Sequence, residues 1–467
     1  MSLAATRGML TVTVGAMLLA VVSVIAVASI AAGDVLALAC LLAAAAAPFG
    51  LVFIDRAAAW EGRDAYRMVI FLIIVLSAVF RLRAIDDKSV DAQILLKLLA
   101  IGLAGLMAAV GLVRADPLRQ GPALPIWCAF FAYMMMTSFI TVTPTLALVE
   151  TGSNLAAFLL LYCTAGLLGR DNLVRALIAS CFILCLLSLG AYIVMPQLGR
   201  MSDWVNGAFT PTWRLQGVFG TANAAGGAAA VGIILTLLLP VRSGSRLLRL
   251  TGLGVFALCL LLSNNRMAMA GLGAALLYAS WPKGGWALKL AIVALATGLI
   301  LLIYLGAGDG LLQVLSRSGS SDEITSGTGR TRIWAVVLEL WSEQPLLGYG
   351  SGAAKYILPK NPLLFTAAAH AHNLFLNILF SGGIVGLCLF VSGLGVAGWR
   401  AVKRADRQAL ALFIFFMAYG ITEPTIGGLV SFVPMAFYAA VVLAINPSPG
   451  LGFGKTRPGQ CLARQMP

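Results

Sequence analysis

The sequence predicts an all-α protein, a polytopic bundle of about 12–14 transmembrane helices with one large loop that contains short helices. Three observations support this fold class. Hydrophobic residues make up 60% of the 467 positions and charged residues only 11%, whereas roughly 25% of the residues in a soluble domain are charged. The mean hydropathy is +0.95. Apolar runs of about 20 residues, enough to cross about 30 Å of hydrocarbon, recur along the whole chain.

The apolar runs divide the chain into membrane helices over 1–305, a large loop over 306–372, further membrane helices over 373–446 and a tail over 447–467. The first run, residues 9–32, is too long for a removable signal peptide and lacks its cleavage pattern, so we expect it to be retained. Several runs are so short that they must extend into flanking polar residues or belong to broken helices. The candidate spans are residues 9–32, 35–54, 68–80, 94–113, 123–141, 154–168, 176–195, 218–240, 250–262, 267–281, 287–305, 373–398, 409–421 and 427–446.

The basic residues indicate which side of the membrane each loop faces. With the N-terminus in the cytoplasm, the cytoplasmic loops and the tail hold 20 basic and 6 acidic residues. The opposite side holds the remaining 12 basic and 12 acidic residues. The whole net charge of +14 then lies on the cytoplasmic side, in agreement with the positive-inside rule. Basic residues spread over short loops between apolar runs do not form the continuous basic stripe of a nucleic-acid-binding protein.

Residues 250–281 allow two interpretations that differ in topology. A single long helix would bury Arg266 near the bilayer centre, which costs at least a few kcal/mol, and would reverse every loop that follows. Two spans with a break at residues 263–266 keep Arg266 at the surface and preserve the charge asymmetry. We therefore predict the break.

The eight cysteines do not indicate a disulfide framework or a zinc site, because no two are spaced CxxC and no loop holds a pair. Motifs of the HExxH and P-loop kinds do not occur in the sequence either, nor does the GxSxG element of hydrolases. We therefore expect neither a metal ion nor another cofactor.

The large loop contains a predicted amphipathic helix over residues 330–344 (RTRIWAVVLELWSEQ). Its apolar residues recur at helical spacing on one face, as in a helix that lies at a membrane surface. Pro345 ends this helix, and Gly348, Gly350 and Gly352 indicate a tight turn after it.

The candidate site residues lie at the predicted outer ends of the spans. His370 and His372 are the only histidines, and they stand where the large loop re-enters the membrane. Four arginines also approach outer span ends beside Gly-rich or Asn-rich turns. Arginine forks match the geometry of a diphosphate, so these residues indicate an anionic ligand at the membrane boundary. The arginines are Arg214, Arg266, Arg330 and Arg332.

The carboxylates give weaker signals. Acidic residues in the segment 81–93 alternate with basic ones, which is typical of a solvated, self-neutralising loop. Glu423 interrupts an apolar run, and the sequence leaves open whether it binds substrate or ends a helix.

Four segments resemble signatures of the bacterial O-antigen ligase and polymerase (Wzy_C) superfamily. Residues 214–223 (RLQGVFGTAN) are similar to its R..G.F..PN segment, and residues 262–266 (LSNNR) to its SR motif at a helix end. Residues 329–334 (GRTRIW), followed by PLLGYG, resemble the loop signature GR..IW…PLLG.G. His372-Asn373, with nine residues before Gly383, resembles the HN…G[IL] signature. The segments follow the family's order over about residues 210–390.

The chain departs from the family pattern at two places. Ser381 stands where the family often has an acidic residue, so no role of that carboxylate carries over. Thr221-Ala222 replaces the usual residues before Asn223.

The resemblance implies a metal-independent, inverting glycosyltransferase of the bacterial inner membrane, with its active site at the periplasmic face. The donor would be a glycan on undecaprenyl diphosphate, and the acceptor a glycolipid or a second lipid-linked glycan. Arg214 and Arg266 would stabilise the departing diphosphate, and His372, with an ordinary pKa near 6.5, would position or deprotonate the acceptor hydroxyl. The residues expected to bind substrate are Arg330, Arg332, Asn223, Asn373 and His370.

Other functions fit the sequence less well. A transporter of lipid-linked sugars would carry charged residues deep in several spans, or repeat symmetry, and neither is evident. A structural scaffold would explain the spans but not the ordered motifs. Within glycan transfer, a ligase with lipid A–core as acceptor is slightly favoured over a polymerase of O-antigen or exopolysaccharide repeats.

Overall fold

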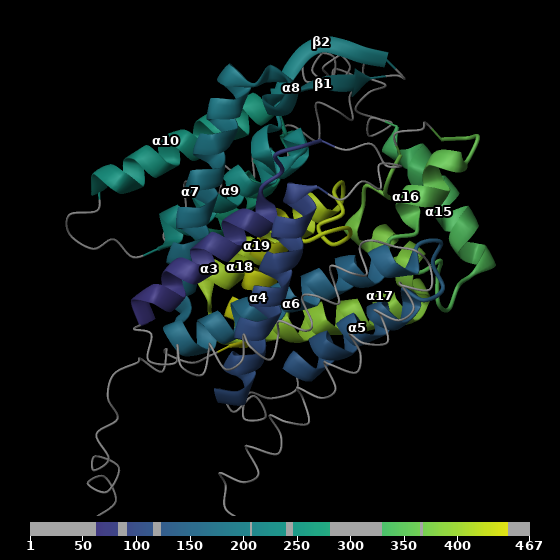
Figure 1. Ribbon diagram of the computed structural model, residues 1–467, viewed down its shortest axis with the longest axis horizontal. Helices are drawn as coiled ribbons and strands as arrows, with labels where there is room; N and C mark the ends of the chain where they lie inside the picture. The colour runs from purple at the N-terminus through teal and green to yellow at the C-terminus, as the bar shows by residue number, and fades with distance from the viewer. Residues whose placement is uncertain are drawn as a thin grey trace, which may run out of the picture.

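The computed structural model describes residues 62–82, 91–114, 123–205, 208–239, 246–280, 329–364 and 368–446. Within these ranges α-helices dominate and pack side by side in a bundle (Figure 1). The candidate spans at 9–32, 35–54 and 287–305, residues 306–328 and the tail 447–467 lie outside the described residues.

Every candidate span within the described residues overlaps a helix. Five of the described helices are long and apolar enough to cross a membrane: α4, α6, α7, α10 and α17. Four others, α5, α9, α18 and α19, are apolar but shorter. The chain is therefore an all-α, multi-pass membrane protein, as predicted. The helices are α3 (Gly62–Ser77), α4 (Ala92–Arg114), α5 (Ala123–Thr137), α6 (Pro144–Leu168), α7 (Arg170–Val194), α9 (Ala222–Leu238), α10 (Arg246–Ser263), α11 (Arg266–Ser280), α17 (Leu374–Lys403), α18 (Arg407–Gly420) and α19 (Phe432–Ile445).

Helix α19 forms the centre of the bundle. All its residues from Phe432 to Ile445 are buried, and α6, α17 and α18 pack around it (Figure 1). A helix that is apolar on every side is stable only when every side is covered. Aromatic rings fill the space between α19 and its neighbours, with Trp127 in contact with Phe158, Phe390 and Phe437.

Several boundaries differ from the sequence prediction, among them the starts of α6 and α19. Helix α6 starts at Pro144 rather than at residue 154. Pro fits the first turn of a helix, and the polar residues Glu150 and Asn154 of α6 are buried rather than exposed in a loop. Helix α19 starts at Phe432 rather than at residue 427, so the apolar residues before it form a connection. Hydropathy cannot locate such ends, since it does not distinguish a buried polar helix turn from a loop.

The break between α10 and α11 is confirmed. Asn264 has a φ of 46°, a left-handed conformation that Asn adopts more readily than most residues. Arg249, near the start of α10, donates to the Leu237 carbonyl at 2.7 Å, and Ser280, at the end of α11, lines a shallow hollow together with Leu238. Both helices therefore begin or end beside the last residues of α9, and the chain reverses direction at Asn264.

This reversal defines two ends of the bundle. We call the end that carries Asn264 and the first residues of α9, α17 and α19 the loop end, and the other the opposite end. The opposite end holds the basic connection between α17 and α18, where Arg404 donates to the Ala444 carbonyl at 2.8 Å and Arg170 pairs with Asp406.

A short β-hairpin and several short helices cover the loop end (Figure 1). The hairpin was not predicted from the sequence. Its strands pair in antiparallel register, with Met201 opposite Arg214. The short elements are α8 (Pro196–Gly199), β1 (Arg200–Val205), β2 (Ala208–Leu215), η3 (Gly217–Phe219), α15 (Arg330–Glu343), α16 (Ala354–Ile357) and η4 (Leu358–Lys360).

Helix α15 confirms the predicted amphipathic helix. It buries Ile333, Val336 and Val337. Ile333 and Val337 belong to a small apolar cluster that also contains Leu358 and Phe380, so the apolar face packs on the rest of the protein.

The turn after α15 docks into a kink of α17 at Gly383. The φ of Gly383 is 60°, and a Cβ atom there would lie 2.1 Å from the Leu346 carbonyl oxygen, so only glycine fits. A kink leaves backbone groups without helical partners. The turn supplies partners: the Ile384 amide donates to the Pro345 carbonyl and the Tyr349 amide to the Phe380 carbonyl, both at 2.9 Å.

Candidate active site

Arg214 connects the β-hairpin to two helix ends. Its Nε donates to the Ser263 carbonyl at 2.7 Å, and one terminal nitrogen donates to the Asn223 side-chain oxygen at 2.9 Å. Only 7% of the residue is exposed. The guanidinium therefore lies between the first turn of α9 and the break that precedes α11, which brings together two of the segments singled out in the sequence.

Asn223 links Arg214 to Glu423 by hydrogen bonds. Its amide nitrogen donates to Glu423 Oε1 at 2.6 Å. Its backbone carbonyl accepts from Asn265 at 3.0 Å and from the Tyr419 hydroxyl at 2.9 Å. Because all these groups are fixed by hydrogen bonds, the carboxylate of Glu423 has a defined position.

Arg330 completes the network from the side of α15. Its Nη2 lies 2.8 Å from the same Glu423 Oε1. The two side chains are 18% and 10% exposed, so this ion pair is largely screened from water. One carboxylate thus holds Arg330 and, through Asn223, Arg214.

Burial raises the pKa of Glu423 to about 7, although Arg330 and Arg214 oppose the rise. A carboxylate with this pKa exchanges its proton near neutral pH. The sequence left the role of Glu423 open, and the structure places it at the centre of the network. The available signal was an acidic residue within an apolar run, which marks a functional position more often than a structural one in membrane proteins.

The two histidines lie against each other. Their ring centroids are 4.0 Å apart, and the His372 backbone amide donates to His370 Nδ1 at 3.3 Å. The φ of His372 is 47°, a strained conformation for a non-glycine residue and one that is common at functional sites. His372 Nδ1 is buried and has no hydrogen-bond partner among the described residues.

Both imidazoles are neutral at physiological pH, which corrects the expectation of an ordinary pKa for His372. Burial and the nearby positive charge of Arg330 lower the pKa of His370 to about 4. Burial, His370 and Arg330 lower the pKa of His372 well below its usual value. A neutral imidazole has one nitrogen that accepts a hydrogen bond or a proton.

Trp334 and Asn373 position the histidine segment. Trp334 Nε1 donates to the Ala371 carbonyl at 3.0 Å. The Asn373 side chain caps α17 by accepting from the Leu376 amide at 3.0 Å, and it donates to the Ile421 carbonyl at 3.0 Å. The histidines are therefore tied to α15 on one side and to the segment that carries Glu423 on the other.

The remaining predicted arginines differ in exposure. Arg266 is the first residue of α11, two residues after Asn264, and is half-buried. Arg332 is exposed on α15.

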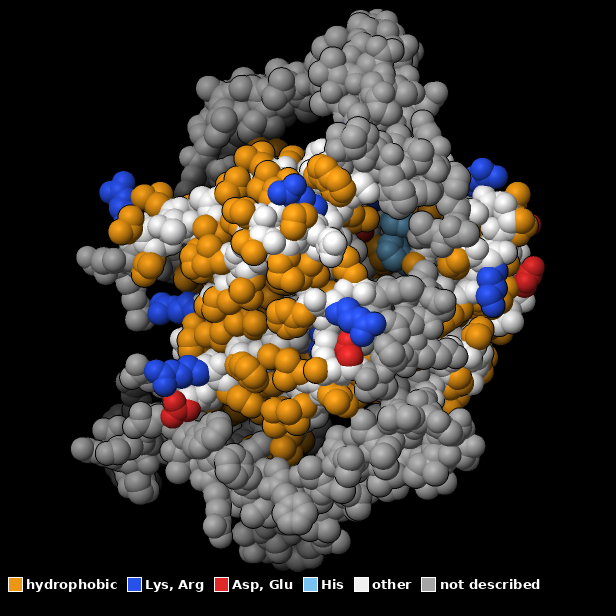
Figure 2. Space-filling model, turned by 45° about the horizontal axis from the view of Figure 1, so that its top comes forward, with side chains coloured by type: hydrophobic (Ala, Val, Ile, Leu, Met, Phe, Trp, Pro, Cys, Tyr) orange, Lys and Arg blue, Asp and Glu red, His pale blue; other side chains and the backbone are white. Residues whose placement is uncertain are grey.

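In Figure 2, histidine side chains are visible in a recess of the surface, beside a broad area of hydrophobic side chains.

Comparison with known proteins agrees with these motifs. A sequence model of the O-antigen ligase family matches residues 251–391. An O-antigen ligase of Pseudomonas aeruginosa is 30% identical over 321 residues, which cover 66% of this chain and 73% of the relative. This chain belongs to the O-antigen ligase family. Its activity is therefore of the glycosyl-transfer type.

The family match covers only part of the network. The helix break, α15 and the histidines lie within residues 251–391. Arg214 and Glu423 lie before and after that range, and they join the network through the contacts of Asn223 and Arg330. Among the described residues, no three His, Cys, Asp or Glu side chains are grouped as metal ligands.

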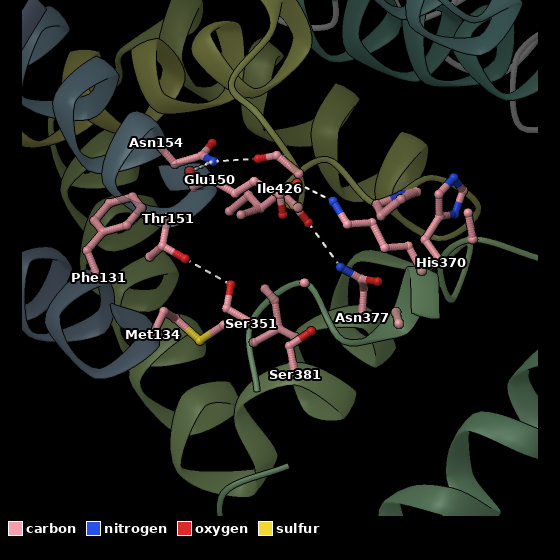
Figure 3. A pocket seen from close by; sticks show the side chains of 18 of the residues that line it. Phe131, Met134, Glu150, Thr151, Asn154, Ser351, His370, Asn377, Ser381 and Ile426 are labelled. Atoms are coloured by element: carbon pink, nitrogen blue, oxygen red, sulfur yellow. Dashed lines mark hydrogen bonds and ion pairs between the residues drawn. The ribbon is translucent and has the colours of Figure 1, made fainter. Parts of the chain in front are cut away.

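His370 also lines a cavity of about 200 Å³ (Figure 3), which sequence reasoning missed. Glu150 and Lys355, which form an ion pair, lie in its wall. No local pattern identified them, because the two residues come from α6 and from α16, 205 positions apart. Glu150 in α6 and Lys97 in α4 are both buried, each within the first seven residues of its helix.

Proposed function

We propose that this family member transfers a glycan from undecaprenyl diphosphate to lipid A–core at the periplasmic face of the bacterial inner membrane, with inversion at the anomeric carbon. The observation that carries this proposal is the network of Arg214, Asn223, Glu423 and Arg330 beside two neutral histidines. The network provides fixed arginine cations that can stabilise a leaving group, and the histidines provide a group that can accept a proton.

The arginines suit the departing diphosphate. As the bond between the anomeric carbon and the phosphate oxygen breaks, negative charge grows on that oxygen. Cations already fixed in a partly dry site stabilise this charge without reorganisation, and each such group contributes roughly 10²–10³ to kcat. Arg214 and Arg330 bring two positive charges to the carboxylate of Glu423. Arg266 begins α11 just after the break whose Ser263 carbonyl Arg214 binds. We assign this role to Arg214 and Arg266, with Arg330 as a further ligand of the diphosphate.

The histidines suit the acceptor. The hydroxyl oxygen of the acceptor attacks the anomeric carbon from the face opposite the diphosphate, and its proton must leave. The Nδ1 atom of the neutral His372 is buried without a partner among the described residues. It accepts a hydrogen bond from the acceptor hydroxyl and then takes the proton of that hydroxyl. The low pKa of His372 without ligand favours the neutral imidazole. A bound diphosphate raises that pKa and so makes His372 a stronger base. Asn223, Asn373 and His370 orient these groups.

The orientation in the membrane follows from charge. The opposite end of the bundle carries Arg400 and Lys403 at the end of α17, Arg404 in the connection that follows and Arg407 at the start of α18. Basic connections face the cytoplasm in bacterial membrane proteins. This supports a periplasmic position for the loop end and for the arginine network.

A reconstituted reaction tests the proposal. A strain from which the gene is deleted accumulates both substrates, so the donor and the rough lipopolysaccharide are isolated from it. Purified protein in lipid nanodiscs should join them in the presence of a metal chelator, because fixed arginines replace the usual metal ion. Failure of the purified protein to form the product would refute the proposed function.

The glycolipids of the deletion strain distinguish the ligase from the polymerase. Loss of a ligase leaves long polymer on undecaprenyl diphosphate and a bare core on the gel. Loss of a polymerase instead leaves cores with single repeats, and that pattern would overturn the assignment of the acceptor.

A further inference from the structure

The cavity next to His370 has one apolar and one polar wall (Figure 3). It lies between α5, α6, the start of α17, the residues that precede and begin α16, and the connection before α19. Phe130, Phe131 and Met134 form the apolar side. Its volume of about 200 Å³ is smaller than the roughly 300–1,000 Å³ of pockets for drug-sized ligands. It therefore suits a single ring rather than an oligosaccharide.

The polar wall contains a buried ion pair with an unused acceptor. Glu150 pairs with Lys355 through Oε1, and only 4% of Glu150 is exposed. Its Oε2 is buried and has no hydrogen-bond partner in the described part of the chain. Such an atom destabilises the protein unless a ligand donates to it. A buried ion pair is also weak evidence for a purely structural role, because apolar residues of similar size often serve as well.

The neighbouring polar groups are arranged around this pair. The hydroxyls of Thr151 and Ser351 are 2.9 Å apart, and both line the cavity. The amides of Asn154 and Asn377 are bonded to the Gly428 and Ile426 carbonyls at 2.9 and 3.1 Å. They hold the connection before α19 in place, which leaves the hydroxyls and the carboxylate to meet a ligand.

The histidine pair lies beside both this cavity and Arg330. His370 lines the cavity and stacks on His372 at 4.0 Å. Pro424, which also lines the cavity, directly follows Glu423 of the arginine network. A molecule in the cavity thus lies next to the histidines, and a diphosphate at the arginines lies near the same pair.

We propose that the Glu150–Lys355 cavity binds the acceptor sugar, the neutral ring that presents the attacking hydroxyl. The charges of Glu150 and Lys355 cancel, which favours an uncharged ring over a phosphate. Ring hydroxyls donate to Glu150 Oε2 and bond to Thr151 and Ser351, while the aliphatic face of the ring packs on Phe131. An attack opposite to the leaving group requires the acceptor on the far side of the anomeric carbon from the diphosphate, so the acceptor needs a subsite of its own beside the histidines. This inference rests on the proposed function, because it names the acceptor subsite of that reaction.

Two variants of the cavity test the proposal. Glu150→Leu combined with Lys355→Met removes the acceptor atoms and leaves no buried charge unpaired. Ser351→Leu fills the cavity and keeps the ion pair. The matched control is Arg170→Met combined with Asp406→Asn, which removes a partly buried ion pair at the opposite end and keeps an Asn cap for the Ala409 amide.

The KM values for the two substrates are measured separately, with rough lipopolysaccharide and lipid-linked donor from the deletion strain. Both cavity variants should raise the KM for the acceptor about tenfold or more and change the KM for the donor by less than about twofold. Binding of rough lipopolysaccharide without donor, followed by thermophoresis, should weaken in parallel. The control variant should match the wild type in both measurements.

The outcomes separate this inference from the proposed function. An unchanged acceptor KM and unchanged binding in both folded cavity variants would refute the subsite while transfer by the wild type continued. A rise in the donor KM alone would place the donor sugar in the cavity and overturn the assignment to the acceptor. If the wild type bound rough lipopolysaccharide through the cavity but transferred nothing, the proposed function would fail and the sugar site would stand.

Discussion

Arg330 and Glu423 are separated by 93 residues in the sequence, yet their side chains meet at 2.8 Å. This contact joins α15 to the connection between α18 and α19. Glu423 Oε1 also accepts from Asn223, so the carboxylate couples three segments of the chain. The arrangement fixes two arginines through contacts within the protein itself, which is what electrostatic stabilisation of a leaving group requires.

Replacement of Arg214 by Ala is predicted to lower kcat by about 10²–10³ and to leave the protein folded and inserted. The same loss is expected for Arg266→Ala. Lys at either position should restore only part of the activity, because an ammonium group cannot form the bidentate fork. Initial rates of transfer, at equal amounts of folded protein, measure both effects.

Arg249→Ala is the matched control, since Arg249 is an arginine at a helix end that donates to the Leu237 carbonyl at the opposite end. It should retain normal activity. Normal activity in Arg214→Ala or Arg266→Ala would remove that arginine from the mechanism.

The pH dependence of transfer is predicted to follow Glu423. Its pKa is raised to about 7, so the carboxylate gains a proton as the pH falls through that value. Protonation removes the charge that holds Arg330, and kcat/KM should therefore fall on the acidic side of about pH 7. The histidines do not produce this change, because the pKa of His370 is about 4 and that of His372 is also well below its usual value.

Glu423→Gln tests this assignment. Gln still accepts from Arg330 and Asn223 but does not titrate, so its activity should be reduced and nearly independent of pH in the same range. If the acidic decline persisted unchanged in Glu423→Gln, another group would control it.

His372→Ala is predicted to lower transfer more than His370→Ala, because the buried Nδ1 of His372 has no partner among the described residues and His372 stands beside Asn373, the cap of α17. The chain contains only two histidines, so NMR of labelled imidazole resolves each ring once one variant is available. Without ligand, the His370 ring should stay neutral down to about pH 5, and the His372 ring should titrate well below its ordinary range. Addition of undecaprenyl diphosphate should raise the pKa of His372.

A His372 ring that titrates near its ordinary pKa in the ligand-free protein would contradict the burial argument. An inactive His370→Ala variant together with an active His372→Ala variant would show that His370, rather than His372, has the role assigned here to His372.

The kink of α17 is predicted to need Gly383. In Gly383→Ala the φ of 60° is unfavourable for a side chain, and the new Cβ atom would lie 2.1 Å from the Leu346 carbonyl oxygen. We expect a loss of at least about 1–3 kcal/mol in stability, visible as a lower thermal midpoint in detergent. Gly395→Ala is the control on the same helix, because a Cβ atom at that position would have no described neighbour within 4 Å. Equal midpoints for the two variants would show that the turn after α15 does not depend on the kink.

Much of this fold was predictable because hydrophobic runs and positive charges report directly on membrane insertion. The helix break at Asn264 followed from the cost of burying Arg266, and the amphipathic α15 followed from its periodicity. The site was predictable only in part. Arg214, Asn223, Arg330 and the histidines lie in local motifs, whereas the partners of Glu423 and Glu150 come from distant segments. The pKa of His372 also depends on burial, which no local pattern encodes.

The proposed periplasmic position of the site depends on a topology that reporter fusions can test. Residues 306–371 are predicted to be periplasmic, and residues 283–289 cytoplasmic, because the chain reverses at Asn264 and the basic residues of alternate loops then share one side. An alkaline phosphatase fused after Ser320 should therefore be active, since this enzyme folds only where its disulfides form. A fusion after Gly284 should be inactive, and a cytoplasmic reporter at the two positions should give the inverse pattern. A fusion after Lys403, in the basic connection at the opposite end, serves as the control and should also be inactive with phosphatase. Activity after Gly284 together with inactivity after Ser320 would place the arginine network on the cytoplasmic side, where a periplasmic glycan transfer could not take place.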